Sequence, residues 1–412
     1  MYANLLKIYR KIGRNGRILI ATEPLWSIPM NWVFFYRSIF LSVVIGLSSM
    51  EIGLLLTVFN LFSSILPLFG GYLADRFGRK RVFMLFDSVS WLVSLIIWMI
   101  SQNIWWILLA CVVESIDSLI YSVWECLLVE DTKPESRPLI YAFISAIYRV
   151  GSLTMPVAGL IVKFYGLDLG CRILFALAFC AMIPMFIIRQ VYLRESEIGE
   201  IVRRDKIFSG FKGYLSSLSL IRENQIILAL ILILIMTGFY NSSYAYFSLY
   251  LVNANGLGLR EEDASYIPSA SSIVSLLLFL SIIPRLKSRS SYLKALILGY
   301  SLGSLAIFIF INLPPGSMLL ALFPAFLLGF HSATVFSVSR AFLMNQIDFV
   351  NSRARAKIMS IAITLSSVIN LPTPTIIGYL FNLNPKLYFV AILVTFISSL
   401  LILIFLGKKR GN

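Results

Sequence analysis

Residues 70–81 read GGYLADRFGRKR and stand between two apolar runs, IGLLLTVFNLFSSILPLF (52–69) and VFMLFDSVSWLVSLIIWMI (82–100). The stretch combines one acid, four cations and three glycines. An apolar helix needs about 20 residues to cross the hydrocarbon core of a bilayer, and each flanking run has about that length. We therefore interpret residues 70–81 as a short polar loop between two membrane spans.

The composition of the whole chain agrees with this interpretation. Of its 412 residues, 58% are hydrophobic and 13% are charged, whereas soluble domains carry about 25% charged residues. Apolar runs of spanning length recur along the chain and predict an all-α polytopic membrane protein with twelve transmembrane helices. The runs are about 18–46, 50–70, 82–101, 104–130, 139–165, 171–192, 224–252, 264–284, 292–312, 317–346, 356–381 and 387–406.

The distribution of basic residues predicts the orientation of the spans. The chain has 35 Lys and Arg and a net charge of +15, and most of these cations lie in the termini and in the loops of one side. Because loops rich in Lys and Arg stay in the cytoplasm, we expect both termini to be cytoplasmic, in the plasma or inner membrane. The loops of the other side carry only Lys163, Arg172, Arg260 and Lys386. The positive charge thus reflects topology and does not indicate a nucleic-acid partner.

A long polar segment, 193–223, divides the spans into two sets of six. We expect it to be a cytoplasmic linker, either with a short amphipathic helix or without regular structure. The halves, 1–192 and 224–412, carry landmarks at offsets of 217 and 216, namely SILP (64–67) against SIIP (281–284) and Pro156 against Pro372. Parallel repeats of six spans are typical of transporters whose substrate site lies between the halves near the midplane.

The loop at 70–81 resembles the signature G-x-L-A-D-R-x-G-R-K of the major facilitator superfamily, which stands between spans 2 and 3. The matching residues are Gly71, Leu73, Ala74, Asp75, Arg76, Gly78, Arg79 and Lys80. The six-plus-six organisation extends the resemblance over nearly the whole chain. The resemblance implies a secondary transporter that works by alternating access.

The same resemblance implies a gate at the cytoplasmic mouth. The gate residues that it implies are Gly71, Asp75, Arg76, Gly78, Arg79 and Asp131. The glycines permit close helix approach and a tight turn. Asp75 is suited to accept hydrogen bonds from a neighbouring helix start, and Arg79 to reach Glu130 or Asp131 at the end of the fourth span. Alternatively, the cations of this loop only anchor it to anionic lipid.

A second motif lies in the fifth run. GSLTMPVAG (151–159) resembles the motif G-x-x-x-G-P-x-x-G-G of the drug/proton antiporter branch of that superfamily. It matches at Gly151, Pro156 and Gly159, whereas Met155 and Ala158 replace the usual glycines. These residues predict a bent helix with a small-residue face at the interface between the halves, and the resemblance implies antiport.

The fourth run carries polar residues at i, i+3, i+7 and i+11, which lie on one face of a helix. They are Glu114, Asp117, Tyr121 and Glu125. In the resembled fold this span lines the central cavity, and intramembrane charges point to function. At about 1.5 Å per residue, Glu114 lies at the depth of Arg37 and Asp117 at the depth of Arg149. We predict both ion pairs, which either couple proton movement to transport or only hold helices together.

His331, the only histidine, lies near the middle of the tenth run. Because a histidine titrates near neutral pH, it is a candidate protonation switch or substrate donor, and equally a neutral side chain bonded to a neighbouring helix. A divalent-metal site with two carboxylates, as in a ferroportin-like carrier, is a third interpretation. We predict no metal site.

Aromatic and amide side chains of the first, fourth and seventh runs are candidates for the wall of a substrate cavity. Mostly apolar walls with a few polar groups suit an amphipathic organic ligand, although aromatic side chains near span ends also anchor helices at the membrane interface. The cavity candidates are Asn31, Trp32, Tyr121, Trp124, Tyr240, Asn241 and Tyr244.

These observations favour a proton-coupled efflux transporter for a small amphipathic organic compound. The alternatives are an uptake symporter for an organic anion or nutrient, a divalent-metal carrier, and a lipid-moving or membrane-embedded enzyme. The sequence shows no nucleotide-binding loop, no HExxH and no Ser-His-Asp spacing, so we predict neither an enzyme nor a cofactor. The expected partners are a small-molecule substrate, protons or another coupling ion, and the lipid bilayer, with the chain as a monomer.

Overall fold

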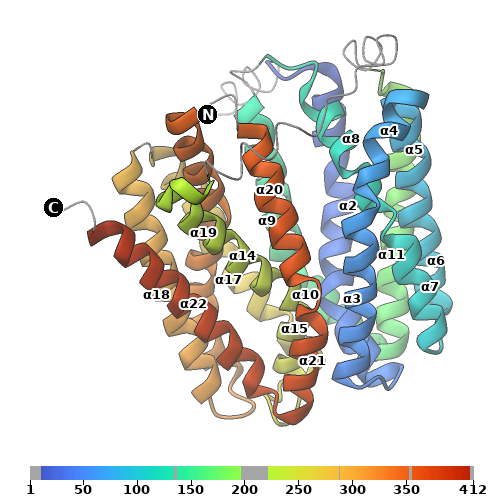
Figure 1. The fold of residues 1–412 in the computed structure, drawn as a ribbon. Coiled ribbons are helices and arrows are strands. Elements are labelled where there is room, and N and C mark those ends of the chain that lie inside the picture. The colour runs from blue at the N-terminus through green and yellow to red at the C-terminus, as the bar shows by residue number, and fades with distance from the viewer. Residues whose placement is uncertain (1–10, 134–136, 196–220, 287, 352–354, 409–412) are drawn as a thin grey trace. The chain divides into compact units, whose positions relative to one another are not determined.

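The computed structural model describes residues 11–133, 137–195, 221–286, 288–351 and 355–408. Among these residues the chain forms helices joined by turns, and no strand occurs. Figure 1 shows the helices in chain order from blue to red. The predicted all-helical fold class is therefore confirmed. The amphipathic helix that we predicted within the linker falls on residues 196–220, outside the described part.

The chain divides into two compact units. Unit 1 comprises Met1–Leu47 and Leu55–Phe208, and unit 2 comprises Ser48–Leu54 and Ser209–Asn412. The short segment Ser48–Leu54 is held in unit 2 by Tyr246, whose hydroxyl donates to the carbonyl oxygen of Ser49 over 2.8 Å. The boundaries of the two predicted halves stay predictions.

Unit 1 contains the helices from α2 to α11, except that the first residues of α3, up to Leu54, belong to unit 2. They are α2 (Arg14–Ile39), the π-helical turn η1 (Phe40–Val44), α3 (Ser49–Ile65), α4 (Pro67–Phe77), α5 (Arg79–Ser88), the π-helical turn η2 (Val89–Val93), α6 (Ser94–Ile100), α7 (Ile104–Glu114), α8 (Asp117–Val129), α9 (Arg137–Leu153), α10 (Met155–Tyr165) and α11 (Leu167–Tyr192). Several predicted spans are thus built from two or three consecutive helical pieces.

Unit 2 contains the second set of helices. They are α14 (Gln225–Ser243), α15 (Ala245–Val252), α16 (Glu261–Ala264), α17 (Tyr266–Ser281), the 3-10 turn η4 (Ile283–Arg285), α18 (Arg289–Asn312), α19 (Met318–Asn351), α20 (Arg355–Asn370), α21 (Thr373–Leu383) and α22 (Lys386–Lys408). Its buried interior is rich in aromatic side chains, including Tyr246, Tyr250, Tyr300, Tyr388 and Phe389.

Ten helical segments of the described chain are long and apolar enough to cross a membrane. They correspond to the predicted runs from 82–101 onward. The first two predicted spans fall short for different reasons. Helix α2 carries Glu23 and Arg37 among its apolar residues, and α3 has 17 residues before the chain reaches Pro67, the first residue of α4. A multi-pass membrane protein is therefore confirmed, whereas the number twelve and the side of each terminus stay predictions.

Each unit contains a membrane helix that is interrupted at a proline. In unit 1 the break lies at Thr154, between α9 and α10, and Pro156 stands in the first turn of α10. In unit 2 the break lies between α20 and α21, with Pro372 as the cap of α21. Proline cannot donate the helical hydrogen bond and collides with the preceding turn. The offset of 216 residues that we read from the sequence therefore joins equivalent breaks.

The stretch 70–81 forms the end of α4, a one-residue turn and the start of α5. Gly78 makes the turn with φ +94°, a backbone conformation that side chains with a Cβ rarely adopt. The predicted tight turn at this glycine is thus present. The surroundings of Gly71 and the side chain of Asp75 lie outside what the structure describes.

Gly70 brings α4 against α8 at van der Waals distance. A methyl group at this position would overlap the carbonyl oxygen of Leu119, and a backbone atom cannot rotate away as a side chain can. We expect Gly70→Ala to lower the free energy of unfolding by about 1–3 kcal/mol, as overpacked cores do. Thermal unfolding in detergent measures this effect.

Gly407→Ala is the matched control, because its Cβ would meet Leu293 at an ordinary 3.5 Å. Alanine also favours a helix over glycine, so the control should be neutral or slightly stabilising. Equal melting temperatures for the two variants would contradict close packing of α4 on α8 at Gly70.

Gly151 of the fifth-run motif has a similar role between α9 and α2. A Cβ at Gly151 would lie 2.6 Å from the amide nitrogen of Asn31 and 2.9 Å from the carbonyl oxygen of Ser27. Gly159 is buried in α10. The motif thus serves close packing inside unit 1, and its predicted position between the halves stays a prediction.

Candidate functional site

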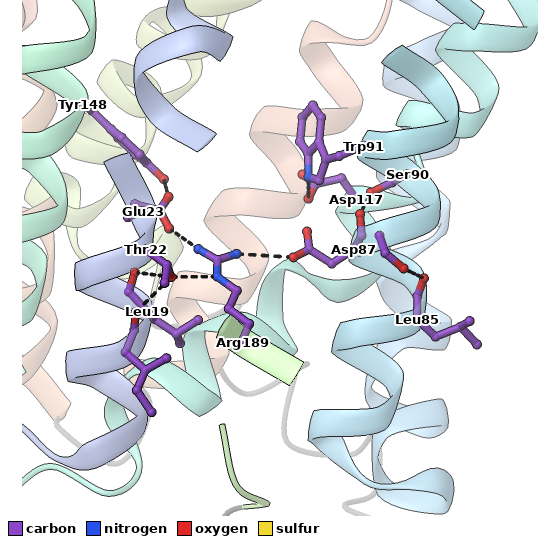
Figure 2. Close-up of polar contacts among 12 residues, drawn as sticks. Leu19, Thr22, Glu23, Leu85, Asp87, Ser90, Trp91, Asp117, Tyr148 and Arg189 are labelled. Carbon is purple, nitrogen blue, oxygen red and sulfur yellow. Dashed lines mark hydrogen bonds and ion pairs between the residues drawn. The ribbon is translucent and has the colours of Figure 1, made fainter. Parts of the chain in front are cut away.

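A buried guanidinium group joins three helices of unit 1. Arg189 of α11 donates to the carboxylate of Glu23 on α2 (Nη2 to Oε2, 2.9 Å) and to that of Asp87 on α5 (Nη1 to Oδ2, 3.4 Å). Its Nε donates to the hydroxyl of Thr22 over 3.0 Å. The side chains of Arg189, Glu23 and Asp87 are only 3%, 5% and 6% exposed. Figure 2 shows Arg189 pointing between the two acids.

A third carboxylate, that of Asp117, lies in the same region (Figure 2). Asp117 is the first residue of α8 and accepts a hydrogen bond from the indole Nε1 of Trp91 over 3.2 Å. Tyr148 of α9 completes the cluster by donating to Oε1 of Glu23 over 3.1 Å. We call Glu23, Asp87, Asp117 and Arg189 the ionic cluster.

The charges of the ionic cluster do not balance when every group is ionised. Three carboxylates then face one guanidinium among the described residues, and the side chains of Glu23, Asp87 and Arg189 are almost fully buried. A buried charge without a counter-charge is unfavourable by several kcal/mol. Taking up a proton on one carboxylate relieves part of this imbalance, so the cluster is chemically suited to hold and release a proton.

A small cavity adjoins the ionic cluster. Its volume is about 90 Å³, the space of roughly three water molecules. Carboxylates and aromatic faces together attract cations, and the indole Nε1 of Trp26 is buried at this wall with no hydrogen-bond partner among the described residues. The lining consists of Glu23, Trp26, Phe83, Asp87, Trp91, Asp117, Ile120, Tyr121, Trp124, Tyr148 and Arg189. Two predicted cavity residues, Tyr121 and Trp124, are thus part of this wall.

The ion pair that we predicted between Arg37 and Glu114 is present. Nη1 of Arg37 lies 2.7 Å from Oε1 of Glu114, and Trp98 donates its Nε1 hydrogen to Oε2 of the same carboxylate over 3.2 Å. The guanidinium also lies over the rings of Phe34 and Trp98, at 5.2 and 5.3 Å. The positive charge of Arg37 is thus neutralised by Glu114, and a role of this pair in coupling stays a prediction.

The expected pair between Asp117 and Arg149 does not appear among the contacts that the structure describes for Asp117. The reason is a break in the helix. Helix α7 ends at Glu114 and α8 begins at Asp117, so the residues of the fourth run do not continue along one uninterrupted helix. Asp117 turns towards Trp91 in the π-helical turn η2 instead.

The loop signature is fixed by acids from other helices of unit 1. Arg79 forms an ion pair with Glu130, one of the two acids that we considered. Asp131, the acid that we placed in the gate, instead accepts from the backbone N–H of Asn15 at the start of α2 over 2.6 Å. Arg76 is exposed and donates to the hydroxyl of Tyr72.

Glu195 was missed by the sequence analysis. Its two carboxylate oxygens accept the backbone N–H groups of Arg79 and Lys80, each over 3.1 Å. An acid at a helix N-terminus is favoured by the helix dipole. This is the bonding that we expected of Asp75 at a neighbouring helix start, supplied here by an acid three residues after the end of α11.

His331 lies in an aromatic enclosure within unit 2. It is buried, its Nδ1 lies 3.2 Å from the carbonyl oxygen of Gly299, and its ring stacks on Phe396 with centroids 4.1 Å apart. Tyr240 and Tyr300 pack edge-on against the same ring. These contacts favour the neutral, helix-bonded interpretation of His331. Among the described residues no group of His, Cys, Asp and Glu could hold a metal ion.

The remaining cavity candidates differ in their surroundings. Asn31 accepts from the hydroxyl of Ser152, and Trp32 donates to the hydroxyl of Thr154 over 3.0 Å, so both tie α2 to the broken end of α9. Tyr240 is buried, whereas Asn241 and Tyr244 are exposed.

The key residues Glu23, Asp87 and Arg189 were also missed, although a signal exists in the sequence. Each lies within a predicted apolar run, at 18–46, 82–101 and 171–192. The sequence analysis singled out none of the three. A charge several residues inside an apolar run is a functional indicator by itself.

Comparison with known proteins agrees with the family that the loop signature resembles. The sequence model of the Major Facilitator Superfamily matches residues 27–368. Comparison with curated proteins gives no match.

Three similar solved structures illustrate the likeness in fold. The nucleoside transporter NupG has a TM-score of 0.69 at 13% identity, with 96% of this chain and 99% of that chain covered. A structure from work on substrate recognition in proton dependent oligopeptide transporters has a TM-score of 0.67 at 12% identity, with 95% of this chain and 97% of that chain covered. A bacterial homolog of the human lysosomal transporter Spinster has 0.62 at 15%, covering 94% and 95%. At these identities the likeness concerns the fold.

Proposed function

The chain belongs to the major facilitator superfamily, and from this membership we propose that it is a proton-coupled secondary transporter that exports a small amphipathic organic compound by alternating access. Membership and the transporter folds of similar structures point to a transporter rather than an enzyme. The coupling ion, the direction and the substrate class are the parts that we propose.

The observation that carries proton coupling is the charge imbalance of the ionic cluster. Arg189 pairs with both Glu23 and Asp87, while the hydrogen bond that the structure describes for Asp117 comes from a neutral indole N–H. If helix movement lengthens one bond of Arg189, the released carboxylate must gain a proton or meet water, because it cannot stay buried and charged alone. Proton uptake is thereby linked to helix position, which is what coupling requires.

The substrate class follows from the wall of the adjoining cavity. Carboxylates and the faces of Trp26, Trp91 and Trp124 favour a positively charged group attached to an apolar body. The charged group of an amphipathic organic cation, which is the part that a cavity of about 90 Å³ has room for, would neutralise the same acids as a proton. Competition of the two for these acids supports exchange in opposite directions, hence efflux.

Uptake of an organic anion or nutrient is the second candidate. Its support is the likeness in fold to solved structures of nucleoside and oligopeptide transporters. Two of the cations that would bind an anion are, however, already engaged: Arg37 with Glu114, and Arg189 with Glu23 and Asp87. We therefore favour a cationic substrate.

Purified protein in proteoliposomes with a pH dye inside tests the proposal. We expect amphipathic organic cations added outside to change the internal pH in proportion to their uptake into the vesicles. Organic anions of similar size should give a signal at least roughly tenfold smaller, because the acids of the cavity repel them. A response to anions alone would replace the proposal by the uptake candidate, and transport of cations without any pH change would remove proton coupling.

A further inference from the structure

A groove separate from the ionic cluster runs between α5 and α11 of unit 1. Its volume is about 800 Å³, and both helices belong to segments long and apolar enough to cross a membrane. The apolar walls consist of Met84, Leu85, Phe186, Ile187 and Val191. Leu85, Ile187 and Val191 are 59%, 58% and 65% exposed, as expected of side chains that meet acyl chains rather than protein.

The groove has one basic end. Lys80 and Arg81, in the first turn of α5, line it beside Gln190 near the end of α11. The ammonium group of Lys80 donates to the carbonyl oxygen of Gln190 over 2.8 Å, which uses one of its three N–H groups. In the described part of the chain no hydrogen bond or ion pair is formed by Arg81, which is exposed. Two cations thus lie at one end of the apolar groove.

The level of these cations in the membrane fits a lipid headgroup. They lie at the first residues of the span Arg79–Ile100. This is the side of the membrane that the basic loops predict to be cytoplasmic. Basic pockets between membrane helices on that side suit the phosphates of anionic lipids. Among the described residues no acid lines the groove, and Glu195 accepts the backbone N–H groups of Arg79 and Lys80.

We propose that this groove is a binding site for one anionic phospholipid. Its phosphate lies between Lys80 and Arg81, and one acyl chain follows the apolar walls formed by α5 and α11. The neighbouring Arg79 forms the ion pair with Glu130. The first turn of α5 therefore carries both the lipid contact at Lys80 and the ion pair of the loop signature at Arg79.

Native mass spectrometry of the full chain tests the site, with phosphatidylglycerol and phosphatidylcholine of identical acyl chains as probes. We expect one phosphatidylglycerol to stay bound under conditions that remove phosphatidylcholine. Each surface cation is worth roughly fivefold in affinity for an anionic lipid. The variant Lys80→Gln/Arg81→Gln should therefore lose roughly 30-fold.

Two further variants separate the parts of the site. Arg285→Gln removes an exposed cation of the η4 turn that donates to the carbonyl oxygen of Ser281 at the end of α17, and it should retain the lipid. Ile187→Trp fills the apolar wall with the cations intact, and it should also release the lipid. If the double variant does not fold, Ile187→Trp alone decides.

Three results would overturn the proposal. The first is equal retention of the two lipids, and the second is retention of phosphatidylglycerol by both groove variants. The third is displacement of the lipid by millimolar inorganic phosphate, which would mark a phosphate site without a role for the acyl chain. Failure of phosphate to compete supports the lipid.

Discussion

Replacing Arg189 by glutamine is expected to lower the free energy of unfolding by about 3–5 kcal/mol, the usual effect of removing one partner from a buried ion pair. The variant leaves Glu23 and Asp87 buried without their counter-charge, since Arg189 joins both at 2.9 and 3.4 Å. It also removes the hydrogen bond to Thr22. Chemical unfolding in detergent, followed by tryptophan fluorescence, measures the loss.

A surface arginine provides the matched control. Arg260 is 76% exposed and lies 3.1 Å from Asp263, and exposed pairs contribute at most about 1 kcal/mol. Arg260→Gln should therefore change stability little. The triple variant Arg189→Gln/Glu23→Gln/Asp87→Asn removes the stranded charges and should recover most of the loss. Equal loss in Arg189→Gln and Arg260→Gln would show that the buried pair contributes no more than a surface pair.

Asp117→Asn and Asp87→Asn, each made singly, are expected to reduce the substrate-triggered pH change far more than substrate exchange, because Glu23 and the aromatic faces remain in the cavity wall for the cation. The amide has nearly the shape of the carboxylate but cannot bind the proton, so the energetic link between proton and substrate is lost. Coupling between two ligands is typically worth 5–150-fold, and we expect the proton signal to fall by a factor in this range. Substrate counterflow across the same vesicles measures exchange separately.

Glu114→Gln is the control for this experiment. Its carboxylate is paired with Arg37 at 2.7 Å and lies outside the lining of the cavity. We expect a less stable protein that still moves protons with substrate. Should the pH signal survive in both Asp variants and vanish in Glu114→Gln, the coupling site would be the Arg37 pair rather than the ionic cluster.

Sequence reasoning predicted the features that depend on local spacing. The glycine turn at Gly78 and the paired breaks at Pro156 and Pro372 follow from backbone rules that act within a few residues. The contact of Arg37 with Glu114 followed from equal depth in the membrane, which a count of residues provides. The turn and the breaks required no knowledge of how helices pack, whereas the ion pair also used the place of the fourth span in the resembled fold.

Features that depend on packing were not predictable in the same way. Arg189 meets partners 166 and 102 residues earlier in the chain, and no spacing rule joins them. Asp117 failed to pair with Arg149 as expected because a break after Glu114 interrupts the helix that we assumed to be continuous. The choice of Arg79 for Glu130 rather than Asp131 depends on which acid faces α5, which a loop sequence does not reveal.

The position of Arg189 near the end of unit 1 has a consequence for synthesis. Ribosomes add about 5–20 residues per second, so the 166 residues between Glu23 and Arg189 take roughly 8–33 s to make. Throughout that interval α2 has an acid in its apolar stretch whose counter-charge has not yet been translated. We therefore expect helix α2 to remain within the insertion machinery, or to enter the bilayer with Glu23 protonated, until α11 follows. Insertion of unit 1 is completed by its last helix, and chains truncated before residue 189 should be degraded rather than accumulate in the membrane.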